Sequence, residues 1–417
     1  MIKKVFIISL VNIILLNYGL LYSQEILSLE PLLKEARENS PDILAAKKRW
    51  ESFRFKVPQA RSPDDPVIGA AFQYTPGSPF QLDKTPSMER SLSLQQFLPF
   101  FGKLSLKGKI ALVESQMAGS EYKNTELLVI SEVKKAYYTL FMNHKEAELR
   151  ETGLLFLNAL AQSAEARYTV GDIQQEDLFK INLEIAKLNN EISNLKQERG
   201  VIETRLNSLL NRKPGTYLGI PELPKEVSFI NEDEALYRLT IENQPELLIF
   251  SYAIEKNKYA KSLAKRSLLP DIMTGIAMRG ITTGTIGPWD LMLAFTVPLW
   301  FWTKQRYEIK EAIANLEEAQ AAYKAMQNRA FSEVKDLATK VEIAKNKLKL
   351  HKSSLIPILE SSIESSLAAF RSGKGDFMML LDSQRMLIET KMNYYKALVD
   401  YNMNLADLER TVGKDLK

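Results

Sequence analysis

The sequence predicts a mainly α-helical fold with a small β part, arranged as two copies of one structural unit. Three observations predict it. Proline-containing motifs recur at a nearly constant separation, long proline-poor stretches carry heptad spacing, and four segments of about ten residues alternate in polarity. The predicted order within each copy is helix, helix, strand, strand, very long helix, long helix.

The duplication is supported by four matches that occur in the same order. The prolines of "ENSPDI" and "ENQPEL" are 204 residues apart, as are Pro66 and Pro270, whereas Pro99 and Pro298 are 199 residues apart. "YTVGDIQQEDLF" then corresponds to "FRSGKGDFMMLL" further along the chain. We divide the chain into a signal peptide (1–23), a first repeat (24–211), a linker (212–228) and a second repeat (229–417).

The N-terminus predicts export. Lys3 and Lys4 precede an apolar run that ends in "LYSQE". The run is shorter than the roughly 20 residues of a membrane-spanning helix, and its charged start and small-residue end are typical of a secretory signal. We expect the mature chain to begin near Gln24, and an uncleaved anchor is the alternative.

The long helices are predicted from missing prolines and from heptads. In 103–168 there is no proline, and about 65 helical residues extend roughly 100 Å. In 303–370 there is only Pro357, which is expected to bend the helix. Coiled-coil seams are predicted along 174–210, along 303–370 from Val334 through Leu348 to Ile358, and along 376–412, which has two adjacent seams. Two seams favour helices arranged as an α-helical barrel over an ordinary antiparallel bundle.

Four strands are expected at 66–75, 88–98, 270–279 and 289–298. Their length matches tilted membrane-spanning strands, and apolar residues such as Leu291 and Leu293 alternate with the opposite face. A soluble sheet with one buried face fits the alternation equally well. Because four strands cannot close a barrel and open edges are not stable in lipid, the membrane interpretation requires several chains to share one barrel.

The sequence gives little support to enzymatic chemistry. Cysteine is absent, and the net charge of +4 is spread over interspersed residues, which argues against disulfides and against a nucleic-acid partner. His144 and His351 are isolated on different helices, and no nucleotide-binding, zinc-protease or serine-hydrolase motif occurs. We predict no enzyme, no metal site and no cofactor.

Together, the signal peptide, tandem halves, paired strands and long helices resemble the TolC family of outer-membrane efflux proteins over 24–413. "QQFLPFFGK" is similar to the strand-to-helix junction of that family. "PFFGK" and "LIPILESSIESSLAAFRSGKGDF" are most similar to the outer-membrane components of heavy-metal RND efflux systems. The resemblance implies a homotrimer with a twelve-stranded β-barrel in outer-membrane lipid and a helical tunnel in the periplasm. It also implies docking to an inner-membrane RND pump through a periplasmic adaptor.

The resemblance further implies which residues act at the periplasmic end. By spacing from the turn glycines, Asp382 corresponds to a carboxylate ring of the aperture, Met379 replaces a second ring aspartate, and Asp177 corresponds to the partner in the first half. An aspartate early in a helix is also explained by simple compensation of the helix dipole. The turns expected to contact the adaptor comprise Gly171, Asp172, Gly373, Lys374, Gly375 and Asp376.

Three alternatives stay open at this point. A type I secretion channel would share every feature above, and a periplasmic coiled-coil adaptor or structural protein would share the export signal and the helical hairpins. An exported α+β enzyme is disfavoured by the missing motifs. The sequence names neither the exported substrate nor the partner pump.

Overall fold

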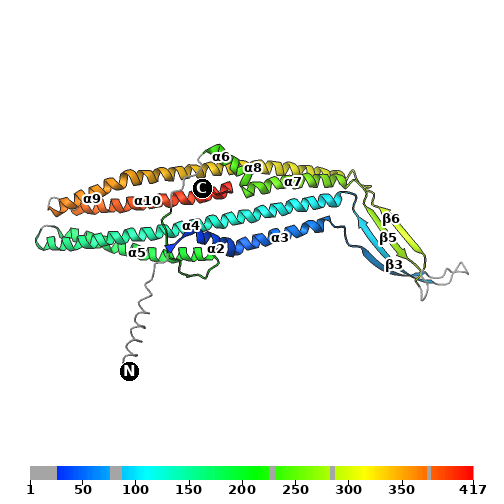
Figure 1. Ribbon diagram of the computed structural model, residues 1–417, viewed down its shortest axis with the longest axis horizontal. Helices are drawn as coiled ribbons and strands as arrows, with labels where there is room; N and C mark the ends of the chain where they lie inside the picture. Colours follow the sequence, from blue (N-terminus) through cyan, green and yellow to red (C-terminus); the bar gives the residue numbers. More distant parts are fainter. Residues whose placement is uncertain are drawn as a thin grey trace, which may run out of the picture. The chain divides into compact units, whose positions relative to one another are not determined.

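The computed structural model describes residues 26–75, 87–171, 173–224, 232–281, 287–372 and 377–416, so the predicted signal peptide lies outside the described residues. The predicted fold class is confirmed: the described chain is mostly helical with a small β part (Figure 1). The helices are α2 (Leu29–Asn39), α3 (Pro41–Arg61), α4 (Lys103–Thr169), α5 (Gln175–Leu209), α6 (Asp233–Asn243), α7 (Pro245–Arg266), α8 (Gln305–Leu350), the π-helical segment η1 (His351–Leu355), α9 (Ile356–Arg371) and α10 (Phe377–Val412). The strands are β1 (Ile26–Leu27), β2 (Val67–Thr75), β3 (Ser87–Leu98), β4 (Ile220–Pro221), β5 (Ile272–Met278) and β6 (Trp289–Phe295).

The chain forms two compact units, and each unit takes segments from both predicted repeats. The strand unit comprises Ala45–Asn124 and Ile241–Phe331. The helical unit comprises Met1–Leu44, Thr125–Thr240 and Ser332–Lys417. The division into sequence repeats and the division into compact units therefore describe different properties of the chain.

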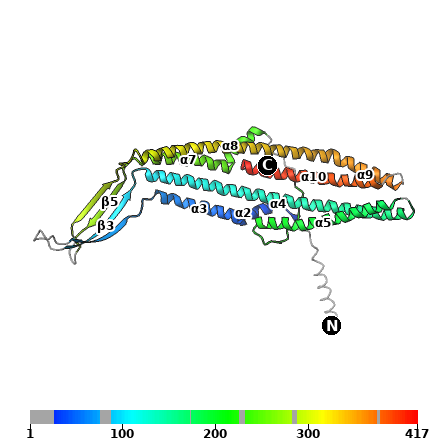
Figure 2. The same cartoon turned by 180° about the vertical axis from the view of Figure 1, so that it is seen from behind.

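The strand unit contains an antiparallel sheet in the order β2-β3-β5-β6 (Figure 2). The strand pair of each repeat is a hairpin, and the two hairpins meet where Gln95 of β3 lies opposite Gly275 of β5. β5 and β6 are shorter than the segments predicted at 270–279 and 289–298. Pro270 and Pro298 lack the N–H that would donate to a neighbouring strand. The strand pairing therefore stops before it reaches either proline.

One face of this sheet is apolar and uncovered in the chain. On this face Ile68 is 74% exposed, Phe72 is 75% exposed and Leu291 is 83% exposed. The opposite face carries small and polar side chains, which include Gly69, Ser91, Ser93, Gln95, Gly275, Ala277 and Ala294. A soluble sheet covers its apolar face, and the described residues of this chain leave that face exposed.

Four helical segments support the sheet within the strand unit. Figure 1 shows α3 beside the first part of α4, and α7 beside the first part of α8. Leu247 of α7 is buried against Met326 and Ala330 of α8. Trp50 of α3 stacks on Tyr122 of α4, with ring centroids 5.8 Å apart. In each repeat, two helices of the strand unit thus pack against each other.

The helical unit confirms the first part of the predicted second-half seam. Val334, Leu337, Val341, Ala344 and Leu348 of α8 are all buried, in a cluster with α10 that includes Leu398, Tyr401, Leu405 and Leu408. A second cluster joins residues of α4, α5, α9 and α10, namely Leu157, Leu160, Ala164, Ile181, Phe370, Leu380 and Leu381. The helix α10 therefore packs against neighbours from both repeats.

The predicted continuation of that seam beyond Leu348 is wrong. Ile358 is 64% exposed, and the helix passes through the π-helical segment His351–Leu355 before it. In this segment the Ile356 N–H donates to the His351 carbonyl. Pro357 has no N–H for the preceding turn, and the wider turn adds a residue that rotates the following side chains out of the seam.

Candidate functional site

Asp177 lies in the first turn of α5. The helix begins at Gln175 without a side-chain cap, and Glu176 and Asp177 place negative charge at the positive end of the helix dipole. Gly171 precedes it in the left-handed conformation, with φ of 83°, and an added Cβ would meet no atom within 4 Å. The glycine is therefore required by backbone conformation and not by close packing.

Met379 and Asp382 lie on one exposed face of α10. Met379 and Met386 are 61% and 52% exposed, and the Asp382 side chain is 56% exposed. Leu380 and Leu381, between them, are fully buried in the second cluster. Because residues three and four apart share a helix face, the buried leucines fix the direction in which Met379 and Asp382 point.

The nearest charged partner of Asp382 is Arg385. The Asp382 Oδ1 lies 3.8 Å from Arg385 Nη1, one turn further along α10. Arg385 also donates from Nη2 and Nε to the two carboxylate oxygens of Glu184 on α5, at 2.6 and 3.2 Å. This bidentate pair joins α10 of the second repeat to α5 of the first.

Arg385 holds the pKa of Glu184 below its ordinary value of 4.5, because hydrogen bonding to the guanidinium favours the carboxylate, and Lys187 adds to the effect. The pair borders a hollow of about 260 Å³ that is also lined by Arg150, Leu188 and Ile388.

Among the predicted site residues, the structure places Gly171, Asp177, Met379 and Asp382. Asp172 and the turn Gly373, Lys374, Gly375 and Asp376 lie outside the described residues. The sequence analysis missed Glu184 and Arg385. They are 201 residues apart, within the range of separations of the repeat, and opposite charges at equivalent positions of two repeats could have indicated the link.

Neither histidine belongs to a metal site in the part of the chain that the structure describes, where no group of three potential ligand side chains occurs. Burial lowers the pKa of His144 to about 4, and its Nε2 has no hydrogen-bond partner among the described residues. None of the described helices combines the length and apolar character that a membrane span requires.

In the described residues, a four-stranded antiparallel sheet with an exposed apolar face is combined with long helices that carry solvated carboxylates. The chain belongs to the outer membrane efflux protein family, whose model matches residues 32–212 and 236–414. The protein is therefore an outer-membrane efflux channel, and the resemblance to TolC-like proteins is confirmed.

Relatives and solved structures agree with this assignment. The chain is 18% identical over 397 residues to the cobalt-zinc-cadmium resistance protein CzcC of Cupriavidus metallidurans, which covers 93% of this chain and 90% of CzcC. It is 22% identical over 343 residues to the outer membrane protein OprJ of Pseudomonas aeruginosa, which covers 78% and 70% of the two chains. Structures of the outer-membrane channel OprN and of CusC match with TM-scores of 0.81 and 0.78 at 17% and 16% identity. They cover 92% and 93% of this chain, and 89% and 92% of their own.

Proposed function

We propose that three copies of this chain form the exit duct of a tripartite efflux system, with twelve strands in one barrel and the long helices in a periplasmic tunnel. The observation that carries the proposal is the exposed apolar face of a sheet that, among the described residues, has four strands. Lipid covers such a face, and other copies complete the barrel. A periplasmic adaptor and an inner-membrane RND pump deliver the substrate, and the channel itself performs no chemistry.

We further propose divalent metal cations as the exported substrates, on the likeness to CzcC, a protein named for cobalt, zinc and cadmium resistance. Deleting the gene in the source bacterium is expected to raise cellular zinc, cobalt or cadmium, measured by mass spectrometry of washed cells. Raised retention of an organic dye with unchanged metal content would contradict this substrate class and leave the channel itself in place.

Extraction and reconstitution test the channel. Purified envelopes are expected to release the protein only with detergent, and the detergent-extracted protein is expected to migrate as a trimer and to conduct ions across a planar bilayer. Release by a salt wash as a non-conducting protein would instead support a periplasmic adaptor.

In this proposal, three Asp382 carboxylates form a ring at the narrow end of the tunnel, where like charges attract multivalent cations. Asp382→Ala is expected to weaken block by hexamminecobalt about two- to fivefold, the range for losing exposed ionic contacts of about 0.5–1 kcal/mol. Met379→Asp, which adds a second ring, is expected to strengthen the block. Single-channel recording measures both effects. Asp336→Ala on α8 removes another exposed aspartate and is the control. Unchanged block in Asp382→Ala would contradict the ring.

Asp177 is proposed to hold the first-half turn near the aperture. Asp177→Ala is then expected to raise the resting conductance without changing the block. If Asp177 only compensates the dipole of α5, the variant instead slightly lowers thermal stability and leaves the conductance unchanged.

The link between Arg385 and Glu184 predicts a pH dependence. The folded pKa of Glu184 is below 4.5, so the stabilising contribution of the link is complete above 4.5 and is lost as pH falls through the lower, folded value. We expect conductance to rise on acidification below 4.5, and Glu184→Gln to have high conductance already at neutral pH with a smaller acid response. An identical acid response in Glu184→Gln would assign that response to other carboxylates.

A further inference from the structure

The sheet has two free edges. Among the described residues, β2 pairs only with β3, and β6 pairs only with β5. The outer backbone groups of both edge strands therefore have no strand partner within the described chain, and such edges pair readily with another strand. β2 and β6 run in opposite directions, because each strand is antiparallel to the next.

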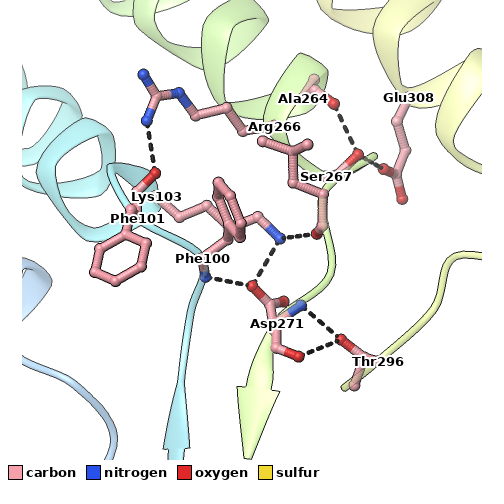
Figure 3. Close-up of polar contacts among 10 residues, drawn as sticks. Phe100, Phe101, Lys103, Ala264, Arg266, Ser267, Asp271, Thr296 and Glu308 are labelled. Atoms are coloured by element: carbon pink, nitrogen blue, oxygen red, sulfur yellow. Dashed lines mark hydrogen bonds and ion pairs between the residues drawn. The ribbon is translucent and has the colours of Figure 1, made fainter.

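Where the two repeats meet inside one chain, an ionic contact accompanies the strand pairing (Figure 3). Lys103, the first residue of α4, is only 8% exposed, and its Nζ lies 2.8 Å from Asp271 Oδ1 and 3.0 Å from the Leu269 carbonyl. The Phe100 N–H donates to the same carboxylate oxygen at 2.7 Å. The acidic residue that precedes β5 is thus bound by the strand-to-helix junction that follows β3.

The loop before β2 also carries acidic residues. Asp64 and Asp65 are both exposed and are separated from the first residue of β2 by Pro66, whereas Asp271 directly precedes β5. The loop is anchored by its own hairpin partner, since Gln96 Nε2 donates to the Asp64 carbonyl at 2.7 Å. Thr296 N likewise donates to the Asp271 carbonyl at 2.9 Å.

At the second strand-to-helix junction, after β6, the basic side chains of Lys304 and Arg306 form no ion pair with a carboxylate of the described residues. Gln305 is the first residue of α8 and is 9% exposed, so it is buried to the same degree as Lys103 at the start of α4. Unlike the Lys103 ammonium, the Gln305 Oε1 has no hydrogen-bond partner in the described part of the chain. Lys304 and Arg306 on either side of it are exposed. This junction therefore presents positive charge and an unsatisfied buried amide beside a free strand edge.

We infer that a second copy of this chain completes the junction. β2 of the next copy pairs with β6, and its Asp64–Asp65 loop lies against Lys304 and Gln305. An ionic contact between a strand-to-helix junction and the acidic loop before a strand then closes the barrel between chains, as Lys103 and Asp271 do between the repeats of one chain. This inference rests on the proposed trimer and goes beyond it by assigning the register and the residues of the interface.

The register follows from the repeat. Within the chain, Gln95 of β3 lies opposite Gly275 of β5. The separation of 199 residues between Pro99 and Pro298 makes Ala294 of β6 the counterpart of Gln95, and the separation of 204 residues between Pro66 and Pro270 makes Ala71 of β2 the counterpart of Gly275. Ala294 of one copy is therefore expected to lie opposite Ala71 of the next. The same register places Leu293 beside Phe72, and both belong to the exposed apolar face. The apolar face is thus continuous from one copy to the next, as a barrel in lipid requires.

Cysteine cross-linking tests the register, because the chain has no native cysteine. Under mild oxidation, the variant Ala71→Cys with Ala294→Cys is expected to form covalent dimers and trimers in denaturing gels. Ala71→Cys with Met292→Cys shifts the pair by two residues on the same face, and cross-linking is expected to fall to the level of the single variants. Ser93→Cys with Ala277→Cys, a pair within the chain, is expected to give an intrachain disulfide without covalent dimers. Equal cross-linking of the shifted pair, or none in the aligned pair of a detergent-stable trimer, would overturn the register alone. Absence of any trimer would overturn the proposed function as well.

A double-mutant cycle tests the ionic contact. Lys304→Gln and the pair Asp64→Asn with Asp65→Asn are each expected to lower the dissociation temperature of the trimer by several degrees, and their combination is expected to cost no more than either alone. Lys265→Gln, another exposed lysine of the strand unit, is the control and is expected to change nothing. Additive losses, or no loss in either variant, would overturn the contact.

Discussion

Replacing Leu293 by arginine is expected to prevent trimer assembly. Leu293 lies near the middle of β6, is 60% exposed, and points to the same face as Leu291 and Phe295. Arginine on the lipid side of a membrane-spanning strand costs about 2–4 kcal/mol near the midplane. In a trimer that cost is incurred three times in one barrel, which makes this the largest effect expected of a single substitution in the sheet.

The neighbouring position provides a matched control. Ala294 lies on the opposite face of the same strand, so Ala294→Arg places an equal charge toward the water-filled interior and is expected to assemble. Heat-modifiable migration of envelope extracts in mild detergent gels measures the trimer. Equal assembly of both variants would show that lipid does not cover the apolar face. Failure of both would mean that the strand itself tolerates no arginine, and the membrane assignment would then lose its support from β6.

The repeating parts of this fold were predictable because they follow from periodicity. The heptad positions from Val334 to Leu348 are buried as predicted, and the alternating segments form strands whose two faces differ as expected. Period and polarity depend only on neighbouring residues in the chain. The fold class and the family could therefore be inferred before any coordinates.

Features that depend on contacts between repeats were not predictable in the same way. The exposure of Ile358 follows from a π-helical segment, and the sequence showed only the proline that accompanies it. The Glu184–Arg385 link joins residues distant in the chain, and nothing in the local sequence distinguishes them from other solvated charges on the helices. The roles of Asp177 and Asp382 stay predictions.

The helical unit also contains a buried ion pair that the sequence analysis did not single out. Lys134 of α4 and Glu409 of α10 are 9% and 6% exposed, and Lys134 Nζ lies 2.5 Å from Glu409 Oε2. Burial raises the pKa of Glu409 above its ordinary value of 4.5, and the neighbouring ammonium only partly opposes this effect. The pair joins the first repeat to the second across a desolvated contact.

Lys134→Met is therefore expected to destabilise the protein by about 3–5 kcal/mol, because a buried carboxylate is left without its partner. The double variant Lys134→Met with Glu409→Leu removes both charges and is expected to recover most of that loss. The midpoint of heat denaturation, followed by circular dichroism in detergent, measures both. Lys335→Met, which breaks an exposed pair with Asp233 in the same unit, is the control and is expected to leave the midpoint nearly unchanged.

The dependence of the Lys134→Met defect on pH identifies its cause. With its folded pKa raised above 4.5, Glu409 binds a proton more readily in the folded than in the unfolded protein. Stability then falls as pH rises from 4.5 through the folded pKa, and it is regained on acidification. The Lys134→Met protein is expected to lose most at neutral pH and to approach the double variant as Glu409 is protonated. A loss that stays constant across this range would mean that Lys134 stabilises the helices through the packing of its aliphatic chain and not through its charge.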